Sequence, residues 1–91
     1  MYHIIRYIAN KPMNYNGEKL LASGAVQYSR EDKNQAETIL TKLYEISANQ
    51  KNMQIQKRTR YTFRCENGLH KYLFKVAKGD NVNKVLEKTY L

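Results

Sequence analysis

The chain has 91 residues, an apolar fraction of 42% and a formal net charge of +8 at pH 7. This length accommodates one small domain, residues 1–91, and leaves no room for a second domain or a deep enzyme cleft. The composition excludes a disordered tail, and no apolar run approaches the roughly 20 residues of a spanning helix. We expect no membrane partner, no secretory leader and, with Cys65 as the single cysteine, no internal disulfide. Together these features favour a reducing, cytoplasmic location.

The positive charge is concentrated in the second half of the chain. Residues 1–50 contain six Lys or Arg and five acidic residues, whereas residues 51–91 contain ten and three. A clustered excess of this kind is typical of proteins that bind a polyanion.

The first predicted elements are two strands, residues 2–9 and 20–28, joined by a long loop. The loop contains Pro12, which cannot donate a ladder hydrogen bond, and the turn-forming pair Asn16-Gly17. Gly24 suggests a bulge or bend in the second strand. These signals predict a hairpin with a long connection.

A helix is predicted to follow, with Ser29 as its N-cap and Glu31 and Asp32 in the first turn. Its apolar stripe repeats every 3.6 residues and contains Ala36, Ile39, Leu40, Leu43 and Ser47, widened by Tyr44 and Ile46. The helix should end near Asn49.

Residues 57 to 79 predict a second hairpin, because Asn67-Gly68 fits a two-residue type I′ turn. Glu66 would then pair with Leu69. One face would collect Thr59, Tyr61, Phe63, Cys65, His70, Tyr72, Phe74 and Val76, and the other Arg58, Arg60, Thr62, Arg64, Lys71, Leu73, Lys75 and Ala77. This register opposes Arg64 to Lys71 and Arg60 to Lys75. Such like-charged pairs destabilise an isolated sheet, and a bound polyanion would offset the repulsion.

A last helix is predicted from Asp80, with Val82, Val85, Leu86 and Tyr90 on its apolar face. The expected fold class is α+β: a mainly antiparallel sheet in the order ββαββα, or βαββα if the first hairpin does not form. The helices would cover the aromatic side of the sheet and leave the basic side exposed.

The sequence favours neither catalysis nor a metal or cofactor. Cys65, His3 and His70 have no zinc-ligand spacing. In the predicted register Cys65 neighbours His70, yet a buried structural thiol is the favoured interpretation over a nucleophile pair. A metal-independent ribonuclease would need His3 and His70 to converge. The glycines match no phosphate-binding loop.

The candidate site is the predicted basic face. Its nucleic-acid-binding residues are Arg58, Arg60, Arg64, Lys71 and Lys75, with Lys57 and Lys78 at the far end. Neighbouring positions on a sheet lie about 4.8 Å apart across strands and about 6.6 Å apart along them, comparable with phosphate spacings. The aromatic residues Tyr61, Phe63, Tyr72 and Phe74 could stack on bases, but we expect them in the core.

In size, charge and its content of Lys, Asn, Tyr and Ile, the chain resembles small basic early proteins of T-even-type phages. These include TifA-type inhibitors of an endoribonuclease toxin–antitoxin system. The resemblance rests on no motif and transfers no residue. It implies RNA binding, a host defence protein as a further partner, and a host cytoplasmic location.

The composition and patterning together predict a non-catalytic nucleic-acid-binding protein. The expected partner is RNA rather than DNA, held through phosphate contacts with weak sequence specificity. Two alternatives stay open: an inhibitor that covers an acidic patch of a target enzyme, and a small metal-independent ribonuclease.

Overall fold

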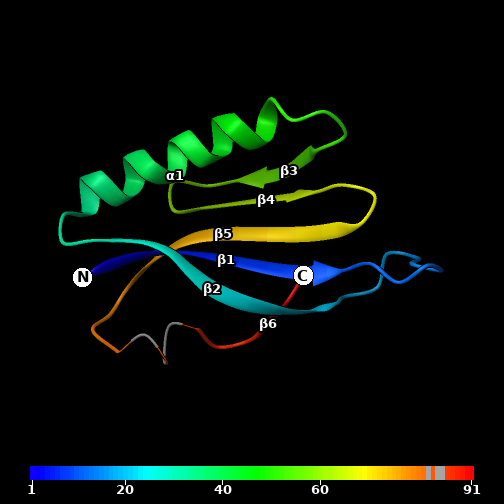
Figure 1. The fold of residues 1–91 in the computed structure, drawn as a ribbon, viewed down its shortest axis with the longest axis horizontal. Coiled ribbons are helices and arrows are strands. Elements are labelled where there is room, and N and C mark those ends of the chain that lie inside the picture. The colour runs from blue at the N-terminus through cyan, green and yellow to red at the C-terminus, as the bar shows by residue number, and fades with distance from the viewer. Residues whose placement is uncertain (82, 84–85) are drawn as a thin grey trace.

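The computed structural model describes residues 1–81, 83 and 86–91. Its elements are β1 (Tyr2–Asn10), β2 (Leu21–Arg30), α1 (Lys33–Ala48), β3 (Gln54–Arg58), β4 (Thr62–Glu66), β5 (His70–Lys78) and β6 (Thr89–Tyr90). The strands form one sheet in the order β3-β4-β5-β1-β2-β6, and all described pairings are antiparallel. Figure 1 shows this order, with α1 along the β3 and β4 end of the sheet. The predicted α+β class and antiparallel sheet are therefore confirmed.

The first hairpin has the predicted long loop. β1 pairs with β2, and residues 11–20 connect them. The bulge lies between Ile4 and Ile5 on one strand and at Gln27 on the other, so the prediction of a bulge at Gly24 is wrong. Gly24 is instead the cross-strand partner of Tyr7, whose ring lies directly against it.

The predicted helix forms with a different start. Asp32 is the N-cap, and its carboxylate accepts a hydrogen bond from the backbone N–H of Asn34 at 2.7 Å. Ser29, the predicted cap, belongs to β2 and bonds the His3 ring instead. The apolar stripe is confirmed, because Ala36, Leu40 and Ser47 are buried and Ile39, Leu43 and Tyr44 pack beside them. Ile46 lies outside this stripe and is exposed.

The second hairpin has a register shifted by two residues. Glu66 pairs with Lys71 rather than Leu69, and the backbone N–H of Asn67 donates to the His70 oxygen at 3.0 Å, so the four-residue turn spans residues 67–70. The carboxamide oxygen of Asn67 accepts hydrogen bonds from the N–H groups of Leu69 and His70. Neither Asn67 nor Gly68 has the positive φ that a type I′ turn requires. The side-chain bonds of Asn67 therefore stabilise a longer turn. A shift of two keeps the paired side chains of β4 and β5 on their predicted faces, because strand side chains alternate with a period of two.

The second hairpin also begins later than predicted. Residues 54–58 form the separate strand β3, which pairs with β4 around a turn at residues 59–61. Because Arg58 is the cross-strand partner of Phe63, it shares a face with that ring. The sequence shows no Gly, Pro or Asn-Gly signal at this turn.

The predicted last helix falls partly on residues 82, 84 and 85, which lie outside the described residues. Its C-terminal part is wrong, because Thr89 and Tyr90 form β6 beside β2. Leu91 then exchanges two backbone hydrogen bonds with Leu20, at 2.8 and 2.9 Å. The chain end is therefore a short extension of the sheet.

The sheet has a buried core on each of its two sides. On the side where α1 packs, the helix side, the buried residues are Ile4, Ala36, Leu40, Phe63 and Cys65. On the opposite side, the far side, they are Ile5, Tyr7, Ala9, Ala22, Leu73 and Leu91. Ile4 and Ile5 are neighbours in β1 and both have 0% exposure, so this strand is buried on both faces.

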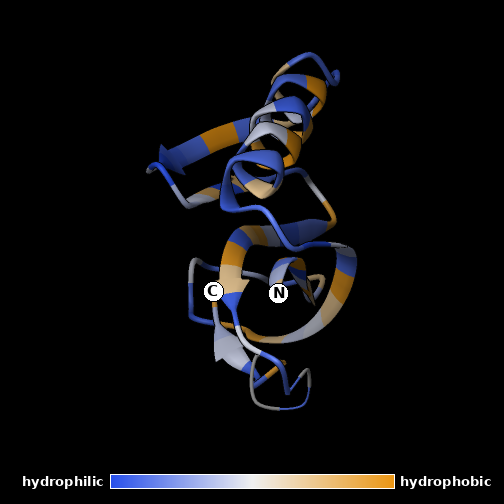
Figure 2. Cartoon of the chain, turned by 90° about the vertical axis from the view of Figure 1, so that its left-hand side faces the viewer, coloured by the Kyte–Doolittle hydropathy of each residue, from blue (hydrophilic) through white to orange (hydrophobic). Residues whose placement is uncertain are grey.

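The two cores cover different parts of the sheet, which is curled rather than flat (Figure 2). The C-terminal residues and Leu20 pack against the far side of β1 and β2. The far-side residues of β3 and β4 belong to neither core; they are Gln54, Lys57, Thr62, Arg64 and Glu66. The prediction that the whole far side would be open is therefore wrong, and only its β3 and β4 part is uncovered.

Replacing Gly24 with Ala should destabilise the protein. A Cβ atom there would lie 2.7 Å from Cε1 of Tyr7, and this ring has only 2% exposure. We expect the free energy of unfolding to fall by about 1–3 kcal/mol in urea denaturation. Gly68→Ala is the matched control, because no atom lies within 4 Å of its Cβ position. Equal stability of the two variants would contradict the packing of Tyr7 on Gly24.

Candidate nucleic-acid interface

Four of the predicted site residues lie together on the far side of the sheet. Lys57 of β3 is the direct partner of Arg64 of β4, which is the partner of Leu73 of β5. Lys71 and Lys75 stand two positions to either side of Leu73, on the same face. We call Lys57, Arg64, Lys71 and Lys75 the cationic face. Its strand spacings place the four side chains within roughly 10 by 13 Å.

The other three predicted residues lie on or toward the helix side, which corrects the predicted basic face. The Arg58 guanidinium lies 4.0 Å from the ring centroid of Tyr44 in α1. Arg60, in the turn, forms an ion pair with Glu37 of α1 at 3.2 Å. Lys78 is the partner of Tyr2, in the face that contains Val76 and Ile4. For Arg58 and Arg60 the cause is the unpredicted turn at 59–61. Lys78 lies two residues after Val76 in β5 and therefore shares its face.

The observed register removes both of the expected like-charged pairs, Arg64 with Lys71 and Arg60 with Lys75. Lys71 is opposite the carboxylate of Glu66, Lys75 is opposite Thr62, and Arg64 is opposite Leu73. The structure forms a different like-charged pair that was not predicted, between Lys57 and Arg64. Directly opposed cations destabilise a sheet by a few tenths of a kcal/mol to about 1 kcal/mol. An anion bound between Lys57 and Arg64 would relieve this repulsion.

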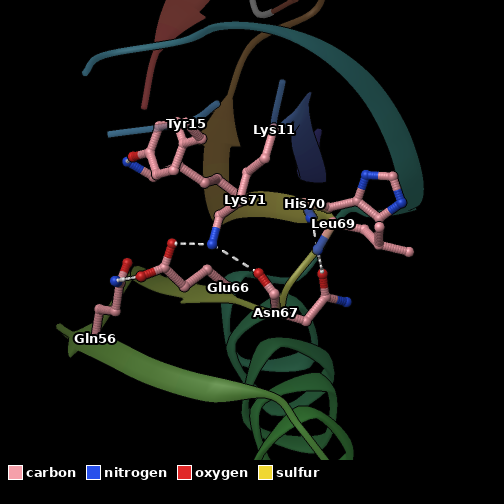
Figure 3. Close-up of polar contacts among 8 residues, drawn as sticks. All are labelled: Lys11, Tyr15, Gln56, Glu66, Asn67, Leu69, His70 and Lys71. Atoms are coloured by element: carbon pink, nitrogen blue, oxygen red, sulfur yellow. Dashed lines mark hydrogen bonds and ion pairs between the residues drawn. The ribbon is translucent and has the colours of Figure 1, made fainter. Parts of the chain in front are cut away.

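Glu66 is the one acidic residue on the described far side of β3, β4 and β5, and it is already neutralised. Its carboxylate forms an ion pair with Nζ of Lys11 at 2.7 Å and accepts a hydrogen bond from the Gln56 side chain. Lys11 also donates to the backbone oxygen of Asn67 at 2.7 Å. Figure 3 shows Lys11 reaching from the loop after β1 to both oxygens at the β4–β5 turn. The side chains of Lys11 and Glu66 are 14% and 18% exposed, so this pair is screened less than a surface pair.

Tyr15 fixes the same loop against the cationic face. Nζ of Lys71 donates a hydrogen bond to its hydroxyl at 3.1 Å. The ammonium groups of Lys11 and Lys71 lie 5.3 and 5.6 Å from its ring centroid. These contacts hold residues 11–15 beside the turn.

Phe63, Tyr72 and Phe74 belong to the helix-side core or pack against it, as the sequence predicts. The prediction is wrong for Tyr61, which is half-buried in the turn at 59–61, beneath Lys33 and Arg60. Phe63 has 1% exposure and stacks on Phe74 with 4.7 Å between ring centroids. Tyr44 of α1 meets Phe63 edge-on at 5.7 Å. Rings packed in this way are closed to nucleobases.

The two histidines do not converge. His3 pairs with Ala77 at one end of β5 and His70 with Asn10 at the other, about 23 Å apart along the strand. His3 is buried, with its ring nitrogens bonded to Ser29 Oγ at 2.6 Å and to the Gly79 oxygen at 2.8 Å. These bonds place it as a structural residue, and the geometry gives no support to the acid–base pair of the ribonuclease alternative.

Cys65 is also not the cross-strand neighbour of His70 that the predicted register would make it. It pairs with Tyr72 rather than His70 and has 1% exposure. Burial raises the pKa of its thiol to about 11, although its hydrogen bond with Ser47 acts in the opposite direction. A thiol in this state is not an activated nucleophile.

Within the described part of the chain, no three His, Cys, Asp or Glu side chains are grouped to hold a metal ion. The described helix is also too short and too polar to cross a membrane. No protein-family model matches the chain, and comparison with curated proteins and with solved structures gave no match.

Two participants in this surface were missed in the sequence, Lys11 and Tyr15. Both lie in the loop after β1, far in sequence from the residues they contact. Pro12 next to Lys11 indicated a loop but carried no information on where the loop packs. No local pattern could have identified them.

The raised pKa of Cys65 predicts a specific loss of stability in alkali. The folded state keeps the thiol protonated up to about pH 11, whereas the unfolded chain ionises from its ordinary value of 9.0. The free energy of unfolding should therefore decrease between these two pH values, by about 2–3 kcal/mol from this group. Urea denaturation of the wild type and of Cys65→Ala across this range measures the difference. Parallel pH profiles for the two proteins would contradict it.

Proposed function

We propose that the protein is a non-catalytic nucleic-acid-binding protein that holds RNA by its phosphates on the cationic face. The observation that carries this proposal is the uncovered far side of β3 and β4, with Lys71 and Lys75 beside it on β5. It presents Lys57, Arg64, Lys71 and Lys75, and its one acidic residue, Glu66, is neutralised by Lys11. A local excess of this size attracts a polyanion and favours release of its counterions.

The arrangement of these charges suits a phosphate backbone. Arg64 can bind a phosphate with both arms of its guanidinium, and the three lysines supply point charges around it. The uncovered far-side positions of β3 and β4 are polar, Gln54, Lys57, Thr62, Arg64 and Glu66. A surface of this composition offers phosphate contacts and little apolar area for a protein partner.

A single strand fits this surface better than a duplex groove. The charges of α1 balance, with Lys33 and Lys42 against Glu37 and Glu45. Its apolar face is covered by the sheet. A recognition helix needs a free, positively charged face to enter a major groove. The preference for RNA over DNA follows the resemblance to small basic phage proteins, and so does a role against a host defence system.

Removing two charges from the cationic face should weaken RNA binding more than removing two from the helix side. We expect Lys57→Gln/Arg64→Gln to reduce affinity and to lower the slope of log K against log salt by about 1.4, at about 0.7 per phosphate. The wild-type slope should be near −3, for about four phosphates. Fluorescence anisotropy with a labelled single-stranded RNA at several salt concentrations measures both values.

Arg58→Gln/Arg60→Gln is the matched control, because it removes the same net charge from the helix side. It should leave the salt slope nearly unchanged. Equal losses in the two double variants would show that net charge, rather than the cationic face, determines binding. If no RNA binds and an affinity-purified protein partner is retained after nuclease treatment, the inhibitor alternative replaces the proposal.

A further inference from the structure

A polar pocket opens at the end of the cationic face, beside the β4–β5 turn. Its volume is about 200 Å³, and it is lined by Lys11, Asn52, Gln54, Glu66, Asn67 and Gly68. The lining comes from three separate segments: the loop after β1, the chain around the start of β3, and the β4–β5 turn. The contacts of Lys11 with Glu66 and Asn67 join the first and third of these segments.

The charged groups of the pocket and the carboxamide oxygen of Asn67 already have hydrogen-bond partners, whereas the side chains of Asn52 and Gln54 do not. Both carboxylate oxygens of Glu66 have partners, Lys11 and Gln56. In the described part of the chain, the side chains of Asn52 and Gln54 make no hydrogen bond to protein, and both are exposed. Asn52 is also the one non-glycine residue with a positive φ, 71°, among those described. A ligand of this pocket therefore meets neutral amide donors and acceptors next to a neutralised ion pair.

The pocket is continuous with the cationic face. Gln54 is the cross-strand partner of Glu66, which is the partner of Lys71. Lys57 and Arg64 follow along the same two strands, on the same side of the sheet. A phosphate on Arg64 and a group in the pocket are therefore about two residues, roughly 7 Å, apart along a strand. This is within the span of one nucleotide and its base.

From this juxtaposition we infer that the pocket is a nucleobase site, which takes one unpaired base of the single strand whose phosphates lie on the cationic face. The inference rests on the proposed function and adds a substrate feature to it. Asn and Gln side chains pair with adenine through two hydrogen bonds, to N6 and N7. Unpaired bases turned out of a single strand are the usual targets of specific RNA recognition. The site therefore selects a single strand with an accessible adenine.

Gly68 offers a way to close the pocket without disturbing the fold. No atom lies within 4 Å of its Cβ position, and its φ is not in the left-handed region. Gly68→Val places a branched side chain at the pocket wall, whereas Asn52→Ala/Gln54→Ala removes the amide groups and leaves the space. Asn34→Ala/Gln35→Ala is the matched control, because it removes one exposed Asn and one exposed Gln from α1.

The experiment compares three oligonucleotides with identical phosphates: uridine throughout, uridine with one central adenine, and the same strand with that central position abasic. Fluorescence anisotropy gives their affinities for each protein. We expect the wild type and the control variant to prefer the adenine strand over the abasic strand by about fivefold. Gly68→Val and Asn52→Ala/Gln54→Ala should abolish this preference while keeping the salt slope of the wild type.

The outcomes separate the pocket from the cationic face. Equal affinity of the wild type for the adenine and abasic strands overturns the nucleobase site and leaves the proposed function standing. An adenine preference that survives in both pocket variants also overturns it. Failure of the wild type to bind any of the three strands overturns the proposed function and the nucleobase site together.

Discussion

The burial of β1 on both of its faces is the constraint on which the rest of the structure depends. Ile4 and Ile5 point to opposite sides and are both fully buried, so each side of the sheet must be covered at this strand. α1 supplies the cover on the helix side, and Leu91 with Leu20 supplies it on the far side. A chain of 91 residues is too short to cover the rest of both faces of the sheet as well. Both sides are therefore covered at β1. From there α1 extends over β3 and β4, whereas the C-terminal residues lie over β2.

This division determines where polar residues can gather. α1 covers β3 and β4 on the helix side, where Phe63 and Cys65 are buried. The opposite side of the same two strands needs no cover, because its residues are Gln, Lys, Thr, Arg and Glu. The pair Lys57–Arg64 is held there by backbone pairing in spite of its like charge. That repulsion is a small cost to the fold and a favourable arrangement for an anion.

The loop between β1 and β2 connects the cationic face to the candidate nucleobase site. Lys11 neutralises Glu66 and binds the turn carbonyl of Asn67, while Tyr15 contacts Lys71. Without Lys11, Glu66 would place an uncompensated negative charge beside Lys71 and at the entrance of the pocket. The loop thus neutralises the one acidic residue of this surface and also forms part of the pocket wall. Lys11, which is remote in sequence, therefore contributes to both the cationic face and the pocket.

The sequence by itself determined the class of the fold, the apolar stripe of α1, the long β1–β2 connection and the sorting of residues 62–77 into two faces. These follow from periodicity, which is local and survives a register shift of two residues. Only the tertiary structure decided the turn at 59–61, the four-residue turn held by Asn67, and the return of the C-terminus as β6. β6 depends on pairing with β2, which is distant in sequence, whereas the two turns are held by local hydrogen bonds that no strong sequence signal marks. For the same reason four of the seven predicted cations share one face, whereas Arg58 and Arg60 contact Tyr44 and Glu37 of the helix.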